Sequence, residues 1–198
     1  MTNHRSILAN QARAYLRRPR LRLDALLVID LEATTYADRD RDAVRDVIQV
    51  GACELRLADG AAQWSDSILV RPTSSEVTPY CAKVTGITPE QAMRGIPFTA
   101  ACEWLKYRCL ARRLAWASFG EWDRMQVTAQ CEREGVEYPF SASHLNIQLL
   151  AALRFGWTRQ GSLRKALARL DMRFEGKPHD ARYDALNAAR VLAKVLRP

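Results

Sequence analysis

The chain has 198 residues, 48% hydrophobic and 26% charged. This fits one ordinary globular domain that can bury a core without the help of disulfides or structural metals. No apolar run approaches the roughly 20 residues of a membrane span, so we expect no membrane insertion. The net charge of +8 favours a nucleic-acid partner without proving one, because a codon bias toward arginine would give the same excess.

Residues 1–23 carry six arginines and no acid. We favour a basic arm that touches nucleic acid, or a solvated extension, over an organellar transit peptide. The expected division is therefore a basic amino-terminal extension at 1–23 and a folded domain at 24–198.

The first expected strand lies in ALLVIDLEATT, residues 25–35. The apolar run Leu26–Ile29 suits a strand buried on both faces, with Asp30 following at its carboxyl end. Side chains alternate along a strand, so Asp30 and Glu32 project from the same face. Two like charges placed together repel, and a hard divalent cation such as Mg²⁺ or Mn²⁺ would relieve them. The simpler alternative is a strand that runs into a loop, where acids are common.

The rest of the chain alternates between strand and helix patterns. Three consecutive strands joined by short turns predict an antiparallel meander, and later helices predict a mixed sheet with helices on both faces. Thr88 and Pro89 carry the cap and first-turn signals of a short helix inside an otherwise loop-like segment, 79–97. The predicted strands are 46–57, 61–70 and 114–119, and the longer helices are 98–113, 121–135, 143–155, 162–170 and 180–196.

Three further groups could join the first two acids. Asp123 follows the predicted strand 114–119, where acids on loops meet the ends of neighbouring strands. His179 and Asp184 open the last helix, and the five-residue spacing brings them together only if His179 lies just before that helix. Each also has an ordinary interpretation, as a helix-dipole acid, a solvated helix acid or a surface histidine. His144 opens the predicted helix 143–155 far from these groups and is interpreted as structural.

The joint pattern of D-x-E, a later aspartate and H-x-x-x-x-D resembles the DEDDh exonucleases, the histidine-bearing branch of the ribonuclease H-like superfamily. The resemblance covers residues 25–197 and is nearest to the exoribonuclease branch that includes the histone-mRNA 3′ exonuclease. It includes the segments IDLEATT, DVIQVGA, VTGIT, ASFGEWDRMQVTAQCEREGVEYPF, HLNIQLL and SLRKALARLDMRFEGKPHDARYDALNAARVL. Gln49 stands where that branch usually has glutamate, Phe119 where it has tryptophan, and Tyr183 where a second aspartate is frequent.

The resemblance implies an α/β fold, a ribonuclease H-like mixed five-stranded sheet flanked by helices. It implies a 3′-to-5′ exonuclease that removes nucleoside monophosphates from single-stranded 3′ ends, with RNA preferred over DNA. The alternatives are a DNA exonuclease of the proofreading epsilon type and a catalytically silent RNA-binding module. The oligomeric state stays open.

The resemblance also assigns roles to individual residues. Asp30, Glu32, Asp123 and Asp184 would hold two Mg²⁺ or Mn²⁺ ions, and His179 would be the general base. The terminal nucleotide would lie against Leu31, Ala33 and Thr34, in a pocket lined by Val84 and Thr85, with Phe119 or Trp122 packed beneath Asp123.

The five cysteines are odd in number and include no C-x-x-C pair. They are expected to be reduced core thiols of a cytoplasmic protein and not a disulfide or zinc framework.

Overall fold

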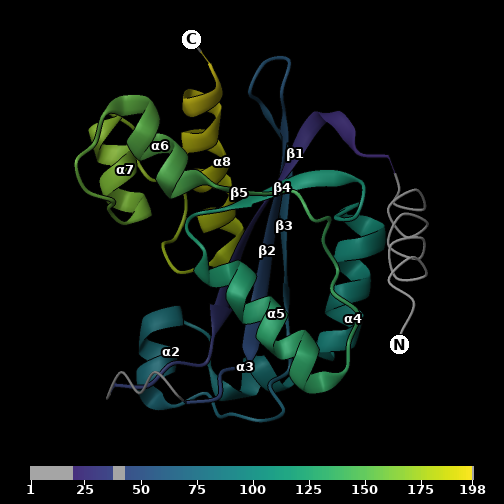
Figure 1. Cartoon of the computed structure of the whole chain (residues 1–198). Helices are drawn as coiled ribbons and strands as arrows, with labels where there is room; N and C mark the ends of the chain where they lie inside the picture. The colour runs from purple at the N-terminus through teal and green to yellow at the C-terminus, as the bar shows by residue number, and fades with distance from the viewer. Residues whose placement is uncertain (1–19, 38–42, 198) are drawn as a thin grey trace, which may run out of the picture.

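A computed structural model describes residues 20–37 and 43–197, built around a mixed sheet with the strand order β3-β2-β1-β4-β5 (Figure 1). β1 is antiparallel to β2, and β2 to β3, whereas β4 runs parallel to both β1 and β5. The predicted meander and mixed five-stranded sheet are therefore confirmed. The strands are β1 (Arg22–Ala33), β2 (Val47–Arg56), β3 (Ala62–Leu69), β4 (Leu114–Ser118) and β5 (His144–Asn146).

Helices pack on both faces of the sheet, and the alternation of β1 explains how. Leu27 and Ile29 face a core shared with α4 and α5, while Leu26 and Val28 face a core shared with α6, α7 and α8. Figure 1 shows these two helix groups apart. Asp30 and Glu32 continue the even-numbered face, so they turn toward α8. The helices are α2 (Pro79–Thr85), α3 (Pro89–Met93), α4 (Phe98–Glu103), a π-helical turn η1 (Trp104–Arg108), α5 (Trp122–Glu134), α6 (Ile147–Phe155), α7 (Leu163–Arg169) and α8 (Ala181–Leu196).

Two segments between the strands differ from the sequence prediction. Residues 79–85 form helix α2 and not a loop, because Thr78 caps the Cys81 N–H, Pro79 occupies the first turn and Gly86 ends the helix in the left-handed conformation. The helix predicted for 98–113 ends earlier, passing through the π-helical turn η1 to Cys109.

The fifth strand lies where the sequence predicted the start of a helix. His144–Asn146 pairs in parallel with Trp116–Ser118 of β4, and the helix begins only at Ile147, capped by the Asn146 side chain. A strand of three residues leaves too short an alternating pattern to recognise.

The ends and composition of the described chain add three observations. β1 begins at Arg22, and residues 1–19 of the predicted extension lie outside the described residues. Across the described ranges, no helix is long and apolar enough to cross a bilayer. All five cysteines are buried free thiols, as predicted.

Candidate active site

Asp30 and Glu32 lie within β1 and not after it, at the point where the strand loses a neighbour. β4 pairs with β1 only as far as Val28. The next part of that edge is open to side chains, and the Leu31 N–H donates to the Asp123 carboxylate (3.0 Å). Asp123 is the second residue of α5, which follows β4 directly, so the end of one strand delivers this acid to the free edge of the next.

The start of α8 supplies the remaining groups. The backbone N–H of His179 donates to the Asp184 carboxylate (2.8 Å), and the His179 ring Nδ1 lies 3.8 Å from a Glu32 carboxylate oxygen. Asp180 caps the helix, so His179 lies just before it, as the spacing required. His179 has a φ of 61°, a left-handed conformation uncommon for non-glycine residues. This conformation accompanies the contacts of its backbone with Asp184 and of its ring with Glu32.

Burial and mutual repulsion make this cluster of acids unfavourable without a counter-charge. Burial, reinforced by Asp184 and Asp123, raises the pKa of Glu32 to about 8. Burial raises the pKa of Asp123 to about 7, and burial followed by Asp123 and Asp184 raises that of Asp30 well above its ordinary value. Burial also raises the pKa of Asp184, although His179 opposes the shift.

A divalent cation would relieve this repulsion, and the donor atoms fit one. Ligand atoms of Glu32, His179 and Asp184 all lie within 4.8 Å of one another. Carboxylate oxygens are the ligands that hard divalent cations prefer. The described residues thus form a site suited to a divalent metal, with Asp30 and Asp123 beside it.

Gln49 in β2 has a role that the sequence did not reveal. Its side-chain N–H group donates to Asp180 (3.2 Å) and to Ser67 (3.2 Å), and its side-chain oxygen accepts from the Ala181 N–H (3.1 Å). Gly51, opposite Asp30, lets α8 approach, because a Cβ there would overlap the Ala181 carbonyl. The first turn of α8, with its catalytic candidates, is therefore anchored on β2.

Asp180 itself is a fifth carboxylate that sequence reasoning missed. Its charge contributes to the raised pKa of Asp30, Glu32 and Asp184. Two features of the sequence could have indicated it: a glutamine at position 49, where the similar branch usually has glutamate, and an acid at the cap of the last helix.

The residues predicted to contact substrate differ in what they can offer. The Thr34 hydroxyl is buried and bonds with Ser75 and the Asp46 N–H, and the Thr85 hydroxyl donates to the Cys81 carbonyl. These hydroxyls are already engaged within the protein. By contrast, Trp122 is 46% exposed next to Asp123. Leu31 and Ala33 are buried, while Val84 and Phe119 are half-buried.

His144 lies nearer to the acids than the sequence suggested. It belongs to β5 and not to a helix, and its Nε2 lies 2.9 Å from the Ser118 hydroxyl. That hydroxyl helps to hold down the pKa of Asp123. Burial lowers the pKa of His144, which suits a neutral ring packed against Trp116.

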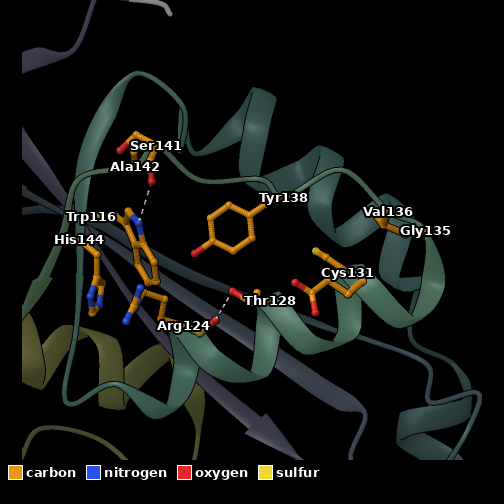
Figure 2. Close-up of a pocket in the computed structure, with 11 residues that line it drawn as sticks. Trp116, Arg124, Thr128, Cys131, Gly135, Val136, Tyr138, Ser141, Ala142 and His144 are labelled. Carbon is orange, nitrogen blue, oxygen red and sulfur yellow. Dashed lines mark hydrogen bonds between the residues drawn. The ribbon is translucent and has the colours of Figure 1, made fainter. Parts of the chain in front are cut away.

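A cavity of about 430 Å³ is lined by residues of β4, α5 and the segment that leads into β5 (Figure 2). None of the four predicted metal ligands lines it, so it does not belong to this site. Its walls include Trp116, Arg124, Thr128, Cys131, Tyr138 and His144.

Comparisons with known proteins agree with this arrangement. The exonuclease family model matches residues 27–192. Rat 3′-5′ exoribonuclease 1 is 26% identical, over 88% of this chain and 53% of the rat protein, so the chain spans about half of that relative. The Snipper 3′-5′ exonuclease of Drosophila melanogaster is 25% identical, over 87% of this chain and 69% of its own.

Among solved structures, the nuclease domain of 3′hExo, described as a DEDDh family member bound to rAMP, superimposes with a TM-score of 0.79. It is 26% identical, and the match covers 87% of this chain and 92% of that one. The family model spans most of the chain. The name DEDDh in the description of the matching structure stands for four acids and a histidine, the same residue types that meet in this site. The chain therefore belongs to the exonuclease family, in its DEDDh branch.

Proposed function

We propose that this chain is a metal-dependent 3′-to-5′ exoribonuclease that releases nucleoside monophosphates from the 3′ end of single-stranded RNA. The observation that carries the proposal is the convergence of Asp30, Glu32, Asp123 and Asp184 at the free edge of β1, with the His179 ring beside Glu32. Acids kept together in this way need cations, and such sites are suited to hydrolysing phosphodiesters. The activity in the relatives' names supports the same reaction.

We infer two Mg²⁺ or Mn²⁺ ions as the cations, held by the four acids. When bound, the ions would offset the charge that develops on the scissile phosphate. The Leu31 N–H occupies one oxygen of Asp123 and so fixes how that carboxylate faces the others.

His179 is the proposed general base. Its side chain is 61% exposed, so water and substrate can reach it, while its backbone is held by Asp184. The ring would accept a proton from the attacking water. The attack breaks the bond between phosphorus and the 3′ oxygen of the preceding nucleotide, which leaves a nucleoside 5′-monophosphate and a new 3′-hydroxyl on the shortened strand.

The terminal nucleotide is proposed to lie over the carboxyl-terminal half of β1. Unpaired bases stack on aromatic faces, and the exposed Trp122 ring next to Asp123 suits this contact. Since the hydroxyls of Thr34 and Thr85 are engaged, their contribution would come through backbone and shape.

The test compares RNA and DNA strands of one sequence, labelled at the 5′ end, with Mg²⁺, with Mn²⁺ and with a chelator. We expect a metal-dependent ladder of shortened RNA, slower loss of DNA, and protection by a blocked 3′ end. Faster loss of DNA would favour the proofreading type. Binding without cleavage under every condition would refute the exonuclease assignment in favour of an RNA-binding module.

The buried thiols support a separate proposal about location. All five cysteines are free, which suits a reducing compartment such as the cytoplasm. Microscopy of the tagged full-length protein would test this, and an oxidising location would contradict it.

A further inference from the structure

We propose that α6, α7 and the loop between them form a track for the sugar–phosphate backbone of the strand whose 3′ end lies among the acids. This proposal rests on the proposed exonuclease function and extends it to the nucleotides upstream. The α6–α7 basic surface is defined here as Arg159, Arg164, Lys165, Arg169 and Arg173, all exposed.

Positive charge is concentrated in this part of the sequence. Residues 147–179 hold seven arginines and lysines against two acids. Within residues 20–37 and 43–197, no member of the α6–α7 basic surface forms an ion pair with a carboxylate. Elsewhere many arginines do have carboxylate partners, namely Arg22, Arg56, Arg112, Arg124, Arg133 and Arg190. Among the described residues, the cations of the surface therefore have no carboxylate partner that would compete with phosphate.

The surface begins beside the segment that holds Asp123. The Asn146 side chain, which caps α6, donates to Glu121 (3.1 Å), and Gln148 in the first turn of α6 lies over Gly120. The Gln148 amide in turn donates to the Gly161 carbonyl (2.9 Å), just before α7 begins. Two hydrogen bonds, from Asn146 to Glu121 and from Gln148 to Gly161, thus connect the loop before Asp123 through the start of α6 with the amino-terminal end of α7.

The first turn of α7 carries two of these cations. Ser162 caps this helix and accepts from the Lys165 N–H, so Arg164 and Lys165 lie in the turn that begins just after Gly161. A strand that left the acids over the exposed Trp122 ring would meet Gln148 and then these two cations. Basic groups that follow a backbone next to aromatic stacking positions are typical of single-strand binding.

Arg169 is held in position within the surface. Its guanidinium lies 4.9 Å from the centre of the Trp157 ring and donates to the Arg159 carbonyl (3.1 Å). Trp157 itself stacks on Phe155, with ring centres 5.5 Å apart. A cation that is already ordered loses less side-chain entropy when it binds a phosphate.

The ligand that fits is a phosphodiester chain longer than the terminal nucleotide. Each phosphate contact adds about 0.7 to the salt slope of single-strand binding. Two lost contacts would therefore reduce the slope by up to about 1.4. The ratio of the wild-type to the variant binding constant would then fall about sevenfold when the salt concentration rises fourfold.

The test uses the full chain with Arg159→Gln and Arg164→Gln together. The matched control is Arg113→Gln with Lys194→Gln, two exposed cations at the ends of β4 and α8 far from the acids. Both are assayed for kcat/KM and for binding across a salt series, with a single-stranded RNA of about 20 nucleotides and with a dinucleotide. Only the long strand has upstream phosphates that could contact the basic surface.

We expect the Arg159→Gln, Arg164→Gln double variant to lose kcat/KM on the long strand and to show a flatter salt slope, with the dinucleotide rate and the control variant unchanged. An unchanged slope would overturn the track, and so would an equal loss on the dinucleotide. Equal competition by polyglutamate would also overturn it, because the surface would then bind acidic peptides as well as RNA. If wild type cleaved no RNA, the proposed function would fail, and the salt slope of long-strand binding would still decide the track.

Discussion

Replacing Gln49 with glutamate tests whether the anchor of α8 positions the active site. The Gln49 amide lies between the Asp180 carboxylate, to which it donates, and the Ala181 N–H, from which it accepts. Glutamate keeps the acceptor but places a second carboxylate about where the donor was. Because the side chain is only 8% exposed, water screens the new repulsion poorly.

The size of the effect follows from the 3.2 Å separation. Two unit charges at that distance repel by about 5 kcal/mol at an effective dielectric of about 20. Protonating a glutamate of ordinary pKa costs about 4 kcal/mol at neutral pH. Because this is less than the repulsion, the new side chain would be protonated and the expected loss of stability is about 4 kcal/mol. For a chain of this size that penalty corresponds to a fall in Tm of about 8–16 °C.

The assay measures Tm by calorimetry and kcat on RNA for Gln49→Glu, with and without Asp180→Asn. If only the first turn of α8 detaches, Tm should fall by less than about 8–16 °C while kcat is largely lost, since His179 and Asp184 lie in that region. Adding Asp180→Asn should restore both quantities, because asparagine still caps helices and can donate to the new carboxylate. Asp180→Asn alone is the control.

Two outcomes would refute this reasoning. A Gln49→Glu protein with wild-type Tm and kcat would show that the amide is dispensable. A double variant that stayed folded but inactive would show that the loss does not come from the Asp180 contact.

Three further predictions concern the acids and the histidine. Asp30→Ala and Asp184→Ala should each abolish hydrolysis while circular dichroism stays native, since each removes a metal ligand and one repelling charge; near-normal turnover of either would contradict the metal site. His179→Ala should lose at least about a hundredfold in kcat with little change in the Mg²⁺ concentration for half-maximal rate, and His179→Asn should be no better, because an amide cannot take the proton; wild-type kcat would exclude this base. In chelator, the free energy of unfolding should fall as pH rises from about 4.5 to 8, because folded Glu32 and Asp123 keep protons that the unfolded chain releases. Mg²⁺ should raise Tm more at about pH 8 than at about pH 6. An opposite trend in calorimetry would refute the raised pKa of these two acids.

Local patterns in the sequence determined much of the scaffold. The apolar run before Asp30 predicted β1, and the alternation of a strand put Asp30 and Glu32 on one face, as the structure has them. The spacing between His179 and Asp184 required His179 to lie just before α8 if the two groups were to meet, as the structure has it. Each of these features depends on residues within a few positions of one another, so the information is present in a short window.

Tertiary structure alone decided how these pieces meet. The early end of β4 leaves the Leu31 N–H free for Asp123, and the short β5 exists only because β4 offers it an edge. The anchor between Gln49 and the start of α8 joins residues more than 130 positions apart. Such contacts depend on strand register and helix packing, which no single stretch of sequence specifies. The residues next to a hydrogen-bonding side chain do not show whether its partner is water or a distant helix.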